Sequence, residues 1–149
     1  MTRQNPPGPQ GSSHRTIIHE VATGREREWP EPHVHPTGWS HDSRSIVGWR
    51  HDGAVVICRL EDGACRVLTT GALPVWPNGA DRVYFARPLE RTEPQDLWSI
   101  GIDGTDERLE AHMGVFRPID RFFTVSPGGQ AAWASFEAGR HAVWTAQVR

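Results

Sequence analysis

The feature that most constrains the fold is a pattern of short strands and tight turns that recurs along the chain. Residues 36–71, PTGWSHDSRSIVGWRHDGAVVICRLEDGACRVLTTG, hold one full copy, in which runs of β-branched and aromatic residues alternate with turns rich in Gly, Asp and Ser. The turn glycines Gly24, Gly63 and Gly104 recur at spacings of 39 and 41 residues. Trp39 and Trp76 are 37 residues apart. A period of this length indicates a repeat architecture.

Four short strands in roughly 40 residues is the layout of one blade of a β-propeller. Helical periodicity is absent, and Gly and Pro interrupt the chain about every ten residues. A β-sandwich is the competing fold, but a sandwich does not explain a period near 40 residues. We therefore predict an all-β fold, a partial β-propeller of about three four-stranded antiparallel blades.

The expected domain organisation follows the repeats. Residues 1–13 are rich in Pro, Gly, Ser and Gln, and we expect them to be a disordered tail. The partial propeller covers 14–149 and divides into a strand pair, two blades and an incomplete blade, at residues 14–30, 36–70, 73–111 and 122–149. These units contain 13 predicted strands, which make about three blades. Even the smallest closed propellers need about four blades. The N-terminal strand pair could complete the last unit, as propeller closure does.

The charge of the chain excludes some partners and some chemistry. The formal net charge is −2, so no basic field favours nucleic acid or an anionic membrane. All 16 basic residues are Arg, and a Walker-type phosphate loop is excluded because it needs Lys. No run is long enough to span a membrane, and residues 1–13 do not resemble a secretory signal. We expect a cytoplasmic protein if Met1 is the true start, and a periplasmic one if an upstream signal is missing.

The two cysteines, Cys58 and Cys65, flank Asp62-Gly63, which suits a two-residue hairpin turn. With that loop Cys65 would face Leu60, and the two thiols would be diagonal neighbours, usually too far apart for an unstrained bond. We expect free thiols that act as small apolar residues.

The repeats resemble those of the TolB-type β-propeller family, whose pattern is roughly P-x-W-S-P-D-G, strands, then D-x-x-G and R-L-T. The matching segments are Trp39-Ser40-His41-Asp42-Ser43, Trp76-Pro77-Asn78-Gly79 and Val125-Ser126-Pro127-Gly128-Gly129, with Arg66-Val67-Leu68-Thr69 and Arg108-Leu109 in the fourth strands. The resemblance covers about residues 14–149. It implies a propeller of six or seven blades, of which this chain would hold the C-terminal ones.

The resemblance implies a non-catalytic scaffold for protein–protein interaction, with no catalytic residue and no cofactor. The partner would be another protein or the missing part of the propeller, and a homodimer of two half-propellers is a second arrangement. A degenerate gene fragment is a third interpretation of the chain. Similar propellers also precede the hydrolase domain of prolyl-oligopeptidase-like enzymes, so a propeller fragment of such a hydrolase is a further alternative.

Six tryptophans recur at strand positions, and we expect them to pack between blades rather than to form a ligand platform. They are Trp39, Trp49, Trp76, Trp98, Trp133 and Trp144.

His33-Val34-His35 has the one metal-like spacing, because residues two apart in an extended chain point the same way. The segment HVHP ahead of a W-S-x-D turn also resembles oligogalacturonate lyases, in which H-x-H-P supplies ligands to manganese. The alternative function is therefore a metal-dependent lyase-like propeller that binds manganese through His33 and His35.

Three other polar motifs are assigned to turns. His41-Asp42 and His51-Asp52 suggest acid–base pairs, but Asp in a turn favours its own backbone. Asp103-Gly104-Thr105-Asp106 begins like a calcium loop, but the remaining ligands do not follow.

Overall fold

The computed structural model describes residues 16–29, 33–87, 94–114, 123–137 and 140–148. The described residues form 13 strands in four antiparallel sheets of two, four, four and three strands, and no helix, so the predicted all-β fold is confirmed. In chain order the strands are β1 (Ile17–Glu20), β2 (Arg25–Glu28), β3 (Val34–Trp39), β4 (Ser45–Arg50), β5 (Ala54–Arg59), β6 (Cys65–Thr70), β7 (Ala72–Val75), β8 (Arg82–Arg87), β9 (Gln95–Gly101), β10 (Arg108–Gly114), β11 (Phe123–Val125), β12 (Gln130–Glu137) and β13 (Arg140–Gln147).

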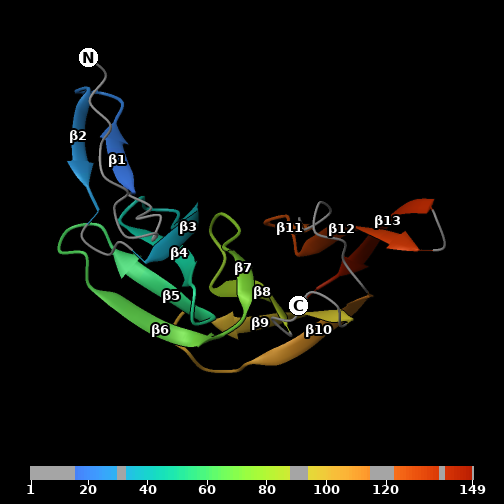
Figure 1. The fold of residues 1–149 in the computed structure, drawn as a ribbon. Helices are drawn as coiled ribbons and strands as arrows, with labels where there is room; N and C mark the ends of the chain where they lie inside the picture. The colour runs from blue at the N-terminus through green and yellow to red at the C-terminus, as the bar shows by residue number, and fades with distance from the viewer. Residues whose placement is uncertain (1–15, 30–32, 88–93, 115–122, 138–139, 149) are drawn as a thin grey trace, which may run out of the picture.

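The four sheets follow one another along an open arc (Figure 1). Each of the three larger sheets is a meander of consecutive strands: β3 to β6, β7 to β10, and β11 to β13. The first strands β3, β7 and β11 lie on the concave side of the arc, and β6 and β10 lie on the convex side (Figure 1). This radial order of consecutive strands is that of propeller blades.

The core lies between the sheets, because the central strands bury both of their faces. In β4, Ile46 points to one side of the sheet and its neighbour Val47 to the other. This explains why β5 and β8 read as continuous apolar runs rather than as alternating ones. The cluster between the two four-stranded sheets includes Val47, Val55, Val83, Phe85 and Ile100, with Trp76 and Trp98 packed against it. The cluster between β7–β10 and β11–β13 includes Tyr84, Leu97, Met113, Phe123, Val125, Ala131 and Trp133.

Polar contacts join equivalent positions of the two four-stranded sheets. The Thr37 hydroxyl donates to the carbonyl of Pro74, 37 residues on, and His41 Nδ1 lies within hydrogen-bond distance of Asn78 Oδ1 at the same separation. On the convex side the Thr69 hydroxyl donates to Glu107, 38 residues away. The sequence period near 40 residues is therefore also the period of the contacts between neighbouring sheets.

The N-terminal strand pair does not take the closing position that the sequence left open for it. β1 and β2 do not complete the β11–β13 sheet; they lie against the β3–β6 sheet, at the opposite end of the arc (Figure 1). Trp29, which follows β2, is 2% exposed and packs on Ile46, Val56 and Cys58. Burial of this large indole anchors the pair to the first four-stranded sheet, an interaction that the spacing of the repeats did not reveal.

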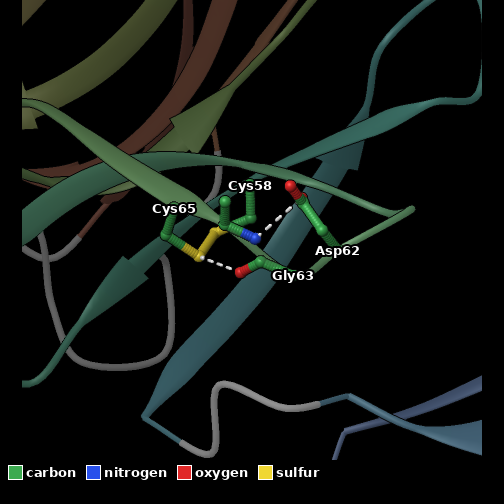
Figure 2. Close-up of a disulfide and its surroundings, with 5 residues drawn as sticks. Cys58, Asp62, Gly63 and Cys65 are labelled. Carbon is green, nitrogen blue, oxygen red and sulfur yellow. Dashed lines mark hydrogen bonds between the residues drawn. A yellow bond between two sulfur atoms is a disulfide. The ribbon is translucent and has the colours of Figure 1, made fainter.

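The prediction of free thiols is wrong, because Cys58 and Cys65 form a disulfide (Figure 2). The turn between β5 and β6 is longer than the two-residue loop that we expected. The Arg59 amide donates to the Ala64 carbonyl at 2.9 Å, and the Gly63 amide donates to the Arg59 carbonyl at 3.1 Å. The longer turn places Cys58 directly opposite Cys65, with a Cα–Cα distance of 4.0 Å.

Candidate functional site

Trp39 and Trp76 hold equivalent positions in consecutive sheets but have different surroundings. Trp76 packs into the cluster between the two four-stranded sheets, and its indole Nε1 donates to the carbonyl of Ala80 at 2.9 Å. It stands beside Gly38 of the preceding sheet, where an added Cβ would lie 4.0 Å from the Trp76 Cβ. Trp39 is 52% exposed. The prediction that the tryptophans pack between blades is thus correct for Trp76 and wrong for Trp39.

The exposure of Trp39 follows from the neighbour that it faces. Trp39 pairs with Ile46 in the β3–β4 ladder, and paired residues project from the same face of a sheet. That face is turned toward β1 and β2, which form a two-stranded sheet in the described part of the chain. Trp76 meets an innermost strand of the preceding sheet at Gly38. Within the described part of the chain, the β1–β2 pair has no corresponding inner strand to cover Trp39.

A cleft separates β1 from β3. Two openings, of about 370 and about 250 Å³, adjoin it, and both are lined by Ile18 of β1 and Trp39 of β3. β2 is held on the outer side, where Arg27 Nη2 donates to the carbonyl of Leu60 at 2.6 Å. The outer part of the β3–β6 face is therefore covered, and its inner part around Trp39 is open. We call this feature the Trp39 cleft.

The other end of the arc also carries exposed apolar surface. β13 is the edge of the three-stranded sheet, and its Val143 and Trp144 are 79% and 48% exposed. The prediction that the tryptophans are packed is therefore wrong for Trp144 as well. Trp133 lies opposite Trp144 in the ladder and is buried.

The structure places His33 and His35 at the start of the β3–β6 sheet. His33 is exposed just before β3, and His35 lies within the strand. His35 Nε2 is 3.1 Å from Nε2 of His51, and the His35 ring is stacked on Trp49 with ring centroids 5.0 Å apart. Sequence reasoning had assigned His51 to a turn and missed its contact with His35. Manganese binding by His33 and His35 stays a prediction.

The acid–base motifs are turn structures, as predicted. Asp42 accepts hydrogen bonds from the Ser40 hydroxyl at 2.6 Å and from the Arg44 amide at 3.0 Å. These bonds, that from Ser40 foremost, lower the pKa of Asp42. Asp52 accepts from the Ala54 amide at 3.0 Å in the same way. The lowered pKa makes Asp42 a poor general base, because the proton affinity of its carboxylate is reduced.

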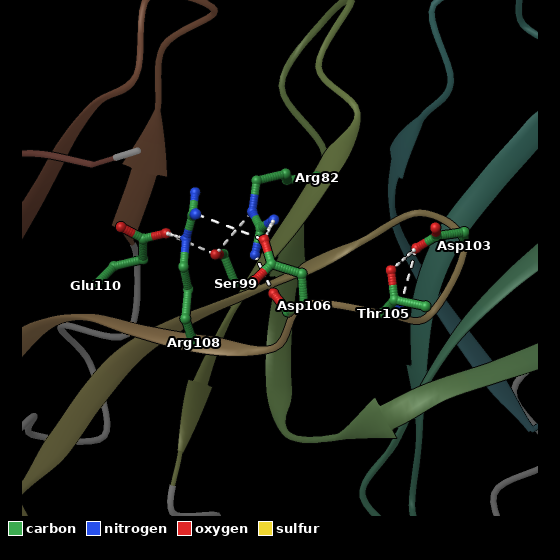
Figure 3. Close-up of polar contacts among 7 residues, drawn as sticks. All are labelled: Arg82, Ser99, Asp103, Thr105, Asp106, Arg108 and Glu110. Atoms are coloured by element: carbon green, nitrogen blue, oxygen red, sulfur yellow. Dashed lines mark hydrogen bonds and ion pairs between the residues drawn. The ribbon is translucent and has the colours of Figure 1, made fainter.

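A polar network on the β7–β10 sheet joins Arg82, Ser99, Asp106, Arg108 and Glu110 (Figure 3). The Glu110 side chain is 4% exposed and accepts from Ser99 Oγ at 2.6 Å and from Arg108 Nε at 2.9 Å. Burial raises the pKa of the neighbouring Tyr84. The donors and acceptors satisfy one another, which is the pattern of a structural network. Asp103 and Thr105 lie apart from it, in the β9–β10 turn (Figure 3), and the bonds that Thr105 donates lower the pKa of Asp103.

Two absences hold for the residues that the structure describes. No group of three or more His, Cys, Asp or Glu side chains is placed to hold a metal ion. The described residues also contain no helix that is long and apolar enough to cross a membrane.

Comparison with known proteins supports the fold. No protein-family model and no curated protein matches the sequence. Among solved structures, the chain is similar to the crystal structure of the tricorn protease, with a TM-score of 0.58 and 12% sequence identity. The similarity covers 87% of this chain and 14% of the tricorn protease chain. At this level of identity the likeness shows the fold alone, a β-propeller type of arrangement.

Proposed function

We propose that this chain is a section of a TolB-like β-propeller that acts as a scaffold for protein–protein interaction and has no chemistry of its own. The observation that carries the proposal is the Trp39 cleft, in which a tryptophan equivalent to a packed one is half exposed. Exposed aromatic side chains that face a cleft are typical of binding hot spots, because they offer a large apolar area at a small entropic cost. The repeated W-S-x-D-like turns support the TolB-like assignment.

The shape of the cleft defines the kind of partner. In the described part of the chain β1 and β2 form a sheet of two strands where the next two sheets have four, and β1 borders the cleft that Trp39 lines from β3. The partner would add a strand beside β1, a mode of recognition that uses main-chain hydrogen bonds for affinity. By analogy with Gly38 opposite Trp76, it would place a small residue opposite Trp39.

Light scattering after size exclusion tests the proposal first, on the full chain and on Trp39→Ala. A dimer that dissociates in Trp39→Ala identifies a second copy as the partner. A monomer directs the test to a separate protein, and a photo-crosslinking residue at position 39 should then link to a two-stranded segment of that protein. The matched control is position 21, because Val21 is also exposed but lies in the β1–β2 turn.

Hydrogen exchange on the assembled protein gives an independent readout. Binding in the cleft should slow amide exchange in β1 (Ile17–Glu20) and leave β10 (Arg108–Gly114) unchanged. An assembly in which Trp39→Ala has no effect and the β1 amides exchange as before would contradict the proposal.

A further inference from the structure

Two imidazoles converge at the beginning of the β3–β6 sheet. His35 lies on β3 and His51 directly follows β4, so they are 16 residues apart in sequence. Their Nε2 atoms lie 3.1 Å from each other. The rings meet nearly edge to face, with centroids 4.7 Å apart and an interplanar angle of 84°. Two imidazole nitrogens at this distance either share one proton in a hydrogen bond or bind one cation that lies to the side of the line between them.

The surroundings hold both rings in place. His35 is the ladder partner of Trp49, and the two rings are stacked with an interplanar angle of 29°. The Trp49 ring also meets the His51 ring edge on, at 6.2 Å. The turn that carries His51 is closed by the Gly53 amide, which donates to the Arg50 carbonyl at 2.9 Å. A pair that is held in this way needs little reorganisation to accept a ligand.

We propose that His35 and His51 bind one divalent transition-metal ion through their Nε2 atoms. Metal–nitrogen bonds of about 2.0–2.1 Å place two ligand nitrogens roughly 2.9 to 3.4 Å apart, for bond angles between about 90° and 110°. The observed 3.1 Å falls inside that range. Neutral imidazole favours Zn²⁺ and Cu²⁺, whereas Mn²⁺ favours oxygen ligands. The site therefore takes Zn²⁺ or Cu²⁺, with water in the remaining positions.

This proposal differs from manganese binding by His33 and His35 in one ligand and in the metal. His33 precedes β3 and is exposed, whereas His51 is the imidazole in contact with His35. It is also independent of the Trp39 cleft, because neither opening beside Trp39 is lined by His35 or His51. The failure of one proposal would leave the other standing.

The test is a titration of tag-free full-length chain with Zn²⁺, followed by calorimetry, and with Cu²⁺, followed by electron paramagnetic resonance. The expected result is one ion per chain and a copper spectrum with coupling to two imidazole nitrogens. His35→Ala and His51→Ala should each weaken Zn²⁺ binding by at least about tenfold, since each removes one of two protein ligands. Mn²⁺ should bind more weakly than Zn²⁺ by a similar factor.

Two controls keep the test decisive. His112→Ala removes an exposed histidine of the β7–β10 sheet, whose Nδ1 lies 2.8 Å from Asp96 of the same sheet, and it should leave the affinity unchanged. His51→Asn removes the imidazole but keeps a polar residue in the turn. Circular dichroism shows whether each variant is folded. Unchanged Zn²⁺ affinity in folded His35→Ala and His51→Ala would overturn the proposal and identify the contact as a hydrogen bond. A loss in His33→Ala but not in His51→Ala would overturn it in favour of the His33 and His35 pair.

Discussion

The Thr37 hydroxyl donates to the carbonyl of Pro74, the residue that occupies the same place in the next sheet. Trp39 and Trp76 are related by the same step of 37 residues. In repeat proteins each unit is stabilised mainly by its neighbours. Two equivalent residues can therefore be compared, because the one that packs on a neighbouring unit shows the contact that the other lacks. The packing of Trp76 on the β3–β6 sheet is thus the model for the contact that Trp39 does not make within the described chain.

The first prediction compares these two tryptophans in the unassembled chain. Trp76→Ala should lower the free energy of unfolding by about 2–4 kcal/mol, because it removes a large side chain from the cluster between two sheets. Trp39→Ala should lower it by less than about 1 kcal/mol, because much of its surface already meets water. Urea denaturation followed by far-ultraviolet circular dichroism measures both. Equal losses would mean that Trp39 is packed in solution.

The second prediction concerns the Cys58–Cys65 bridge. Opening it should lower the free energy of unfolding by about 2 kcal/mol, the size expected for a short closed loop. Guanidinium denaturation with and without a reductant measures the change. A variant with Ser at both positions should be insensitive to the reductant, which separates loss of the bridge from other effects. Detection of two free thiols in the folded, unreduced chain would contradict the structure.

The sequence predicted the features whose signals lie within a few residues of one another, and it did not predict the features that depend on distant residues. The strands follow from turn residues and apolar runs only a few positions apart, and the structure confirms them. The bridge was missed because a turn two residues longer than Asp62-Gly63 changes which residues face each other. The contact of His35 with His51 depends on the register between β3 and β4, which a pattern within one strand does not contain. The exposure of Trp39 depends on a neighbour, and a single side chain carries no signal of that neighbour.

The third prediction is a pH dependence that arises from Glu107. Hydrogen bonds, first that from Arg87, hold the pKa of Glu107 below its ordinary value of 4.5. At pH values around these two pKa values, the unfolded chain therefore binds more protons than the folded chain. The stabilisation is present above pH 4.5 and is lost as the pH falls through the lowered pKa of the folded state. Glu107→Gln should flatten the fall of stability in acid, measured by thermal melts between about pH 5 and pH 3, whereas Glu61→Gln, in an exposed turn, should not.

The fourth prediction concerns the buried carboxylate of Glu110. Glu110→Ala should lower the free energy of unfolding by about 2–3 kcal/mol, because the Ser99 hydroxyl, fully buried, loses its acceptor. Arg108 is partly exposed, so its charge can be hydrated, which keeps the loss near the lower end for a broken buried pair. A double-mutant cycle with Arg108→Ala isolates the Arg108–Glu110 term. A coupling energy near zero would contradict a structural role for that contact.

The last prediction concerns the open end of the arc at β13. Val143 is 79% exposed and lies on the edge strand of the three-stranded sheet, where unpaired backbone and apolar surface favour association. Val143→Lys should change the free energy of unfolding by less than about 0.5 kcal/mol, because the side chain has little packing to lose. The same variant should reduce concentration-dependent association, since a charge on an edge strand opposes pairing. Light scattering over a range of concentrations measures association, and Val21→Lys, another exposed valine but in the β1–β2 turn rather than on an edge strand, is the matched control. Equal effects of the two substitutions would show that association depends on overall charge rather than on the β13 edge.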